Sequence, residues 1–543
     1  MKNYKSLLMI LLLILRGSSL TSQVTLTESN LPIITINTNG KTIVDEPKIT
    51  ADIRFVFNAN GLTKPTDTAN IYYGKVGIEM RGSTSQSLSA KKPYSIELRD
   101  TAGNTNEIGL FKGWTKIEDY ALVAPYSDKS LMRDALTYHL ASSIMPYAPK
   151  TRFCELILNG NYQGVYVITE NIKRKRLGIS KADSLATSGD ALTGSYILKI
   201  DKTTGDPNGI SSGFNSQYTE INGNKTYYIY HYPKPEDIKP AQVTYIKTLV
   251  RDFETVMKSD KFNNDTEGYA KYFDVSTLVD YCIMNELTNN VDGYRLSTYF
   301  FKDKNSINPK FQMGPVWDYN IAMGNADYCQ GGDPTVWAYQ FNSRCPVGNW
   351  VLPFWWEKLF SDKKFKVKLK ERWFQLRQNQ LATPRIMGVV DSFNTLLSTA
   401  QDRNFKKWNV LNTYVWPNRK VNGTYPNEIA YLKDWLNQRL AWLDGQMTAL
   451  KTSDHPRDEL SLEVFPNPSV SGGEVRFAYY LTYDSNLTLK IYNAMGQLVE
   501  QQDVKQKAGD NNLYWHKNAP KGLFIYDLFL NGSRWKTGKL SRL

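Results

Sequence analysis

Two aspartates at the ends of a predicted β-hairpin are the residues best placed to carry chemistry. Asp292 and Asp318 flank a strand-like run at 296–301, a turn and a second strand-like run at 310–317. Because a hairpin holds its two ends together, we expect both carboxylates at its open end. Two neighbouring carboxylates can bind Mg²⁺ and orient a hydroxyl group for phosphoryl transfer. Aspartate is also common in turns at strand ends, so the pair alone does not define a site.

A lysine and a glutamate upstream form a second candidate pair. In the predicted strand 90–98, Lys92 is in phase with the apolar residues, so we expect it to point toward the covered face and Lys91 toward solvent. Glu170, at the end of the predicted hairpin around Asn159-Gly160, is placed either to pair with Lys92 or to cap the next turn. On these residues alone, an ordinary surface ion pair is the simpler interpretation.

Several familiar catalytic sites have no support in the sequence. The chain contains no phosphate-binding loop of the Walker type, no HExxH, no GxSxG and no CxxC, and it has four histidines in 543 residues. Histidine-based triads and zinc hydrolysis are therefore poorly supported. Carboxylates, lysines and amides remain as the groups that could act.

The elements that must position these residues are of mixed type. Strand-like runs separated by turn residues fill 31–98, and Asn159-Gly160 between two apolar runs predicts a type I′ hairpin. Apolar residues at helical spacing predict helices, the first of them capped by Asp128. The predicted helices span 130–143, 269–287, 354–380 and 430–450. We therefore expect an α+β body.

The chain divides into four predicted segments. Residues 1–22 have a basic start, a short apolar run and a small polar region, which is typical of a signal peptide. We expect a main domain over 23–451, a polar linker over 452–459 and a small β-sandwich over 460–543, where short alternating strands follow one another without a helical pattern. No later run is long and apolar enough for a transmembrane helix, so we expect a secreted or surface protein without a membrane span.

The four cysteines fit an exported protein. Cys329 and Cys345 lie in one loop-like stretch rich in Gly, Asp and Pro, and closing so short a loop is favourable in an oxidising compartment. We expect these two residues to form a disulfide. Cys154 lies in a strand pattern and Cys282 in a helix pattern, so both are expected to be buried small hydrophobic residues.

The positive charge does not indicate a nucleic-acid partner. The net charge of +13 comes from 66 Lys and Arg against 53 Asp and Glu, and a binding footprint would require clustering. The one dense basic run is 173–176, which we interpret as an exposed turn after a strand, although it could also meet an anionic ligand.

A series of separated motifs, in order, resembles the spore-coat-protein-H (CotH) kinase-like family over roughly residues 30–450. The motifs are Arg81-Gly-Ser-Thr-Ser with Lys91-Lys92-Pro-Tyr, the run 124–134, the hairpin 155–170, Tyr196-Ile-Leu-Lys-Ile-Asp201, Asn290-Val-Asp292 and Gly314-Pro-Val-Trp-Asp318. The resemblance implies an atypical, two-lobed protein-kinase-like fold. It also implies transfer of the γ-phosphoryl group of ATP, with Mg²⁺, to a hydroxyl group of a protein substrate.

The resemblance also assigns roles to individual residues. It implies that Asp292 is the catalytic or metal-side aspartate and that Asp318 is a metal ligand. It places Lys92 on the nucleotide phosphates with Glu170 as its partner, and it groups Arg81 with the cofactor-binding residues.

Two positions depart from the family pattern. The chain has Asn320 where relatives usually carry an aspartate, and Ser297 where an asparagine would suit a second metal contact. Both changes remove a group that could hold Mg²⁺. The alternative interpretation is therefore a catalytically inactive, kinase-like extracellular scaffold or binding protein.

The tail carries its own resemblance. Val464-Phe-Pro-Asn-Pro-Ser, the run 487–499, Gly522-Leu-Phe-Ile-Tyr-Asp-Leu and a basic end at 536–542 are similar to the C-terminal sorting domain of the type IX secretion (Por) route. This resemblance implies the type IX secretion machinery as a partner. A carbohydrate-binding module is the alternative.

Overall fold

The computed structural model describes residues 24–183, 187–203, 209–450, 462–470, 472–481, 484–507, 509–515 and 519–543. The chain forms two compact units. The larger contains the described residues up to 359 together with 371–446, and the smaller contains 360–370 and the described residues from 447 onward. The predicted signal peptide, 1–22, and the predicted linker, 452–459, lie outside the described residues.

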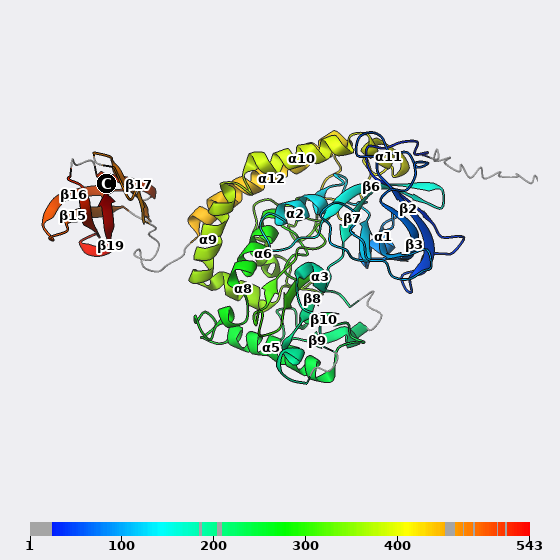
Figure 1. The fold of residues 1–543 in the computed structure, drawn as a ribbon, viewed down its shortest axis with the longest axis horizontal. Coiled ribbons are helices and arrows are strands. Elements are labelled where there is room, and N and C mark those ends of the chain that lie inside the picture. Colours follow the sequence, from blue (N-terminus) through cyan, green and yellow to red (C-terminus); the bar gives the residue numbers. More distant parts are fainter. Residues whose placement is uncertain are drawn as a thin grey trace, which may run out of the picture. The chain divides into compact units, whose positions relative to one another are not determined.

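The N-terminal part of the larger unit is a closed β-barrel (Figure 1). Its strand order is β1-β2-β3-β4-β5-β7-β6, and β1 closes the barrel by pairing in parallel with β6. The strands are β1 (Ile33–Asn37), β2 (Ile49–Val56), β3 (Tyr72–Met80), β4 (Tyr94–Arg99), β5 (Asp119–Val123), β6 (Thr151–Leu158) and β7 (Asn161–Glu170). Alternate residues of these strands, such as Val76, Ile78, Ile96 and Leu98, form one buried core. The expected β-rich start of the chain is confirmed.

The turn between β6 and β7 has the predicted chemistry. Asn159 and Gly160 both adopt positive φ, 49° and 74°, as a type I′ turn requires. Among residues with a side chain, asparagine is one of the few that adopts this conformation readily, so this turn fixes the register of the hairpin that ends in Glu170.

A second sheet in the larger unit carries the predicted hairpin. Its five strands run in the order β12-β11-β8-β10-β9, with every pair antiparallel. They are β8 (Tyr196–Ile200), β9 (Gly213–Asn215), β10 (Tyr227–Tyr232), β11 (Thr298–Lys302) and β12 (Gln312–Met313). The hairpin is therefore real, although its second strand is shorter than the sequence suggested.

Helices complete the larger unit. The longer ones in or entering it are α2 (Arg133–Ala141), α5 (Pro240–Lys258), α6 (Val275–Thr288), α8 (Phe354–Ser361), α9 (Lys363–Arg377), α10 (Thr383–Leu397), α11 (Ala400–Lys407) and α12 (Tyr425–Ala449). Short helical turns are α1 (Thr84–Leu88), α3 (Arg174–Leu177), α4 (Gly189–Thr193) and α7 (Phe341–Arg344), and 3₁₀ turns lie at Gly209–Ser212, Tyr269–Lys271 and Ala338–Gln340. The model is thus of mixed α+β class.

The structure contradicts one helix prediction and supports another. The single helix expected over 354–380 is wrong: α8 and α9 are separated at Asp362, whose carboxylate accepts the backbone N–H of Lys364 and Phe365 (both 3.2 Å) and so starts a new helix. Asp128 does support the start of α2 as expected. Its carboxylate accepts the N–H of the first helical residue, Arg133, at 2.8 Å.

The smaller unit contains two antiparallel sheets around one core. One has the order β13-β14-β17 and the other β16-β15-β18-β19. The strands are β13 (Leu462–Phe465), β14 (Val475–Leu481), β15 (Ser485–Asn493), β16 (Leu498–Gln506), β17 (Gly509–Trp515), β18 (Gly522–Leu530) and β19 (Ser533–Arg542). Buried residues of both sheets, including Phe477, Leu489, Trp515 and Leu528, share this core. The all-β tail is therefore confirmed.

Within the described residues, no helix is both long and apolar enough to cross a membrane.

Candidate functional site

The turn that carries Asp318 is held by helix α2. Asp134 and Tyr138 are four residues apart and so lie on one face of this helix. The Asp134 carboxylate accepts the N–H of Tyr319 at 2.6 Å, and the Tyr138 hydroxyl accepts the N–H of Asp318 at 2.8 Å. The ring of Tyr138 also stacks on Trp317, with the centroids 6.1 Å apart. Two backbone groups and one ring thus fix the position of Asp318.

Asp318 has an unusual backbone conformation and an unusual charge environment. Its φ is 62°, in the left-handed region that Asp and Asn tolerate best among residues with a side chain. Part of its surface is open to solvent. Burial by the surrounding protein and, after it, the negative charge of Asp292 nevertheless raise its pKa to about 6. The side chain therefore lies close enough to Asp292 to feel its negative charge.

Asn290 links the segments that carry the two aspartates. Its side-chain oxygen accepts the N–H of Asp292 at 3.2 Å, and its side-chain nitrogen donates to the carbonyl of Asp318 at 3.3 Å. The expected convergence of Asp292 and Asp318 is supported by this bridge and by the effect of one charge on the other. The roles predicted for the two residues are a separate matter and stay predictions.

Two cations oppose the acidic charge from different elements. Arg81 follows β3, and its guanidinium carbon lies 5.2 Å from the ring centroid of Trp317. Lys202 follows β8, and its ammonium group contacts Thr84 Oγ1 at 3.4 Å. Both positive charges lower the pKa of Asp318, whereas Asp201 raises it. The ends of β3 and β8 therefore bring further charged groups to the surroundings of Asp318.

The expected directions of the two lysines are wrong. Lys91 is the buried one: its ammonium group donates to the carbonyl of Val165 and to Asn404 Oδ1 (2.9 Å) and lies over the Tyr166 ring. Burial lowers the pKa of Lys91 to about 7. Lys92 is partly exposed. The physical reason is that β4 begins only at Tyr94, so strand alternation does not extend back through Pro93 to the lysines.

The structure gives Lys92 and Glu170 different partners. Lys92 donates to the carbonyl of Gln86, in the helical turn α1 that follows Arg81. Glu170 forms an ion pair with Arg176 at 2.6 Å, and both side chains are almost completely buried. Burial raises the pKa of Glu170, and the charge of Arg176 opposes this rise. The expected Lys92–Glu170 pair is therefore not formed, and the nucleotide-binding role of Lys92 stays a prediction.

The basic run 173–176 is not the exposed turn that we expected. Arg176 is buried against Glu170, and Lys173 forms an ion pair with Asp119. Lys175, which is exposed, pairs with Glu107 at 2.5 Å, so three of the four positive charges have an acidic partner within the fold.

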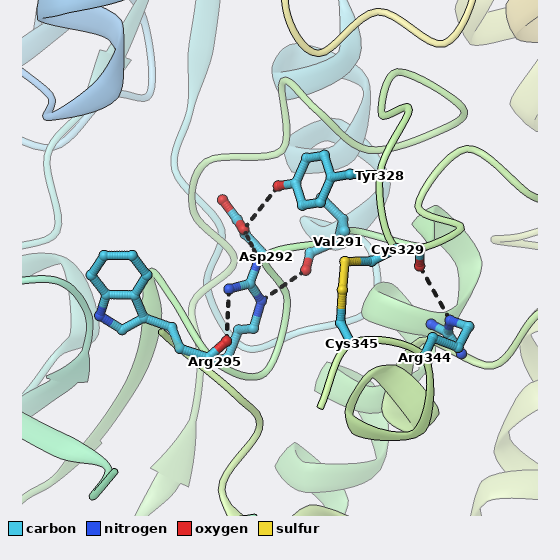
Figure 2. The surroundings of a disulfide bond; sticks show 8 residues. Val291, Asp292, Arg295, Tyr328, Cys329, Arg344 and Cys345 are labelled. Atoms are coloured by element: carbon cyan, nitrogen blue, oxygen red, sulfur yellow. Dashed lines mark hydrogen bonds and ion pairs between the residues drawn. A yellow bond between two sulfur atoms is a disulfide. The ribbon is translucent and has the colours of Figure 1, made fainter. Parts of the chain in front are cut away.

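The disulfide between Cys329 and Cys345 is formed as predicted, with the Cα atoms 5.7 Å apart (Figure 2). Cys154 and Cys282 are free and buried, also as predicted. The surroundings of the disulfide contain two residues that sequence reasoning missed. Arg295 Nη2 pairs with Asp292 Oδ1 at 2.5 Å, and the hydroxyl of Tyr328 lies 3.4 Å from the same oxygen.

A comparison with protein-family models identifies the body of the chain. The model described as "CotH kinase protein" matches residues 78–443, more than half of the chain. The chain belongs to the CotH kinase protein family. The matched region of this CotH protein includes Arg81, Asp292 and Asp318, together with the disulfide and the residues that support both aspartates.

A second family model matches the tail of the CotH protein. It is described as "Secretion system C-terminal sorting domain" and covers residues 463–539, which include nearly all of the described strands of the smaller unit. A sorting domain of the type IX route indicates that the protein is exported, to the cell surface or beyond it. The expected localisation is therefore confirmed.

Similarity to solved structures adds no functional information. Latent PorU from Porphyromonas gingivalis is 20% identical over 16% of this chain and 9% of its own, with a TM-score of 0.14. The sensor domain of the anti-sigma factor RsgI4 from Pseudobacteroides cellulosolvens is 11% identical over 17% of this chain and 98% of its own, with a TM-score of 0.13. The DNA glycosylase AlkC from Pseudomonas fluorescens, 11% identical, covers 34% of this chain and 54% of its own, also with a TM-score of 0.13. The chain spans less than a tenth of PorU. No curated protein matches it.

Proposed function

We propose that this CotH protein is an exported atypical protein kinase that transfers the γ-phosphoryl group of ATP, with Mg²⁺, to a hydroxyl group of a protein substrate. The observation that carries the proposal is the bridge from Asn290 to the carbonyl of Asp318 and the N–H of Asp292, which joins the segments of the two aspartates. In line with this arrangement, the charge of Asp292 raises the pKa of Asp318. A carboxylate in an environment that disfavours its charge, such as that of Asp318, is stabilised by a bound divalent cation. Mg²⁺ uses one or two carboxylates together with waters and phosphate oxygens, so the two aspartates fit it.

The described residues contain no group of three or more His, Cys, Asp and Glu side chains arranged as a metal site. This agrees with a site in which the nucleotide itself completes the coordination. Bound together, Mg²⁺ and ATP would supply the phosphoryl group and neutralise its developing charge. Asp318, fixed by α2, is the proposed metal ligand, and Arg81 and Lys202 are placed to attract the phosphates.

Asp292 is proposed to accept the proton of the acceptor hydroxyl. Its carboxylate is about one quarter exposed, so a substrate can reach it. The hydrogen bond from its own N–H to Asn290 and the ion pair with Arg295 hold the carboxylate in place. We further propose that the barrel and the helical part with the second sheet correspond to the two lobes of a kinase-like fold, with Lys92 and Arg81 on the barrel side.

A catalytically inactive scaffold is the second candidate. Ser297 and Asn320 favour it, because each removes a polar or charged group that the family pattern supplies for the metal. The two candidates differ in whether the protein binds nucleotide in a metal-dependent way.

Calorimetry distinguishes the two functions. ATP should bind the wild-type protein with Mg²⁺ present and lose at least tenfold in affinity, about 1.4 kcal/mol, in EDTA or in Asp318→Asn. Asp391→Asn on α10, which alters an exposed carboxylate paired with Lys433, is the matched control and should bind normally. If folded wild-type protein shows no Mg²⁺-dependent ATP binding, the scaffold is the correct function.

A further inference from the structure

The carboxylate of Asp292 is held by two residues from different segments of the chain. Arg295 Nη2 pairs with Asp292 Oδ1 at 2.5 Å, and the hydroxyl of Tyr328 lies 3.4 Å from the same oxygen (Figure 2). Arg295 is almost completely buried, and its guanidinium plane lies over the ring of Phe341. Burial and the charge of Asp292 raise the pKa of Tyr328, so its phenol stays protonated and can donate.

Each of these two residues is connected to one side of the disulfide. Tyr328 directly precedes Cys329. Arg295 donates from Nη1 to the carbonyl of Trp350 at 3.0 Å, and Trp350 follows Cys345 by five residues. The disulfide joins the segment that positions Tyr328 to the segment that positions Arg295 (Figure 2). Arg344 adds a hydrogen bond from Nε to the carbonyl of Cys329 at 3.2 Å.

The two segments differ in how firmly the rest of the protein holds them. The loop after Tyr328 is fixed without the disulfide, because the side-chain amide of Asn289 donates to the carbonyls of Gln330, Gly331 and Asp333 at 2.9–3.3 Å. Residues 346–350 are more exposed: Val347 is 91% and Trp350 38% accessible. Their described polar contacts include hydrogen bonds from Asn222 and Asn224 to Gly348 and Asn349. Breaking the disulfide should therefore release the segment around Trp350 without unfolding the protein.

We propose that the Cys329–Cys345 disulfide is a positioning device for Asp292, which holds Tyr328 and the Trp350 segment in register so that the carboxylate faces the acceptor hydroxyl. This inference rests on the proposed kinase function of the same site. It predicts that phosphoryl transfer depends on the disulfide. Metal-dependent nucleotide binding does not, because Asp318 is fixed by α2 instead. The disulfide thus makes transfer sensitive to the redox state of the surroundings.

The chain offers a clean way to test this dependence. It has four cysteines, and the two outside the disulfide are free and buried. Cys329 and Cys345 are both partly exposed, so a thiol reductant can reach them. Dithiothreitol supplies two electrons and two protons: the S–S bond breaks, both cysteines become thiols, and the reagent closes into its cyclic disulfide.

The experiment compares oxidised protein, reduced protein and the double variant Cys329→Ser with Cys345→Ser. Hydrogen exchange measured by mass spectrometry should become faster in peptides that cover 291–296 and 346–351 and stay unchanged in the barrel. Transfer of labelled phosphate from ATP to casein or to the protein itself should fall at least tenfold on reduction, with ATP affinity unchanged. Dithiothreitol should have no further effect on the double variant, which is the control for any other action of the reagent.

A second variant tests the contact itself. Tyr328→Phe keeps the ring stacked on Trp416 (centroids 5.8 Å apart) and removes only the hydroxyl that reaches Asp292. It should lower the transfer rate at saturating ATP without changing the affinity for ATP or the exchange of the disulfide loop.

The outcomes are separable from those of the kinase proposal. Unchanged exchange in 291–296 after complete reduction overturns the positioning role, whether or not the protein transfers phosphate. Loss of the circular-dichroism signal on reduction also overturns the positioning role, because the disulfide would then stabilise the whole fold. If exchange changes locally as expected but no preparation transfers phosphate, the proposed kinase function fails, and with it the role of the disulfide in transfer.

Discussion

The side-chain amide of Asn290 donates to the main-chain carbonyl of Asp318 at 3.3 Å, across 28 residues of sequence. The same side chain accepts the N–H of Asp292. One uncharged side chain therefore links the main chains that carry the two carboxylates. An asparagine can do this because it offers a donor and an acceptor on one group and adds no charge of its own.

The first prediction concerns the pH dependence of nucleotide binding. Asp318 should bind a metal only when ionised, and its pKa is raised to about 6, first by loss of water and then by the charge of Asp292. Mg²⁺-dependent ATP affinity should therefore fall as the pH falls through about 6, above the ordinary range of about 4 for aspartate. Asp292→Asn should move the midpoint lower, because it removes the repelling charge. Calorimetry between pH 5 and pH 8 measures both, and equal midpoints for the two proteins would contradict the closeness of the carboxylates.

The second prediction concerns stability without nucleotide. A raised folded-state pKa means that the folded protein binds more protons than the unfolded chain between about pH 4 and pH 6. The free energy of unfolding should therefore fall as the pH rises through this window. Asp318→Asn, which keeps a residue suited to φ near 60°, should stabilise the protein at pH 7. The gain is expected to be at most about 1 kcal/mol, because solvent screens a partly exposed group. It should vanish below pH 4. Urea unfolding at both pH values tests this, and a destabilised Asp318→Asn at pH 7 would count against it.

The third prediction separates the neighbouring lysines. Burial lowers the pKa of Lys91 to about 7, so the unfolded chain binds more protons between about pH 7 and pH 10. Wild-type stability relative to Lys91→Met should therefore rise with pH in this window, by at most about 1.4 kcal/mol per pH unit. Lys92→Met is the matched control, and its free energy of unfolding should change with pH as that of the wild type does. It should instead weaken Mg²⁺-dependent ATP binding, which Lys91→Met should leave unchanged. If Lys91→Met weakened ATP binding and Lys92→Met did not, Lys91 would be the lysine that contacts the nucleotide.

The fourth prediction concerns export. The strands of the smaller unit surround a core of their own, and the sorting-domain match lies within 463–539. Removal of the residues after Asp458 should therefore leave a folded body that fails to reach the cell surface. Surface labelling and fractionation of cells that carry the shortened gene measure this. Normal surface display of the shortened protein would show that the tail is not the export signal.

Much of the fold could be predicted because it depends on local chemistry. Asn159-Gly160 determines a hairpin through the φ angles of two residues, and the strands of the barrel alternate in burial as their sequences do. The long helix at 354–380 was predicted without its break. Asp362 is one polar residue within an otherwise helical pattern. Its capping role depends on its carboxylate reaching the backbone N–H groups of Lys364 and Phe365.

The site was predicted less completely than the fold. Asp292 and Asp318 could be found because a hairpin joins them in sequence. The partner of Glu170 could not be found, because Arg176 lies in a basic run whose composition suggested an exposed turn, while tertiary packing buries it. Tyr328 was missed because its contact crosses 36 residues of sequence, which include the whole β11–β12 hairpin. Arg295 did offer a signal, since it lies three residues after Asp292 in the same turn.

The most direct test of the account is the transfer of labelled phosphate from γ-labelled ATP, measured with Mg²⁺ on wild type, Asp292→Asn and Asp318→Asn. We expect Mg²⁺-dependent transfer to protein by the wild type. Asp292→Asn should bind ATP normally and transfer about 10²–10⁴-fold more slowly, as expected for loss of a positioned catalytic group. Asp318→Asn should fail to bind ATP in a metal-dependent way. Wild-type transfer that survives Asp292→Asn unchanged, or no ATP binding by folded wild type, would contradict the proposed kinase.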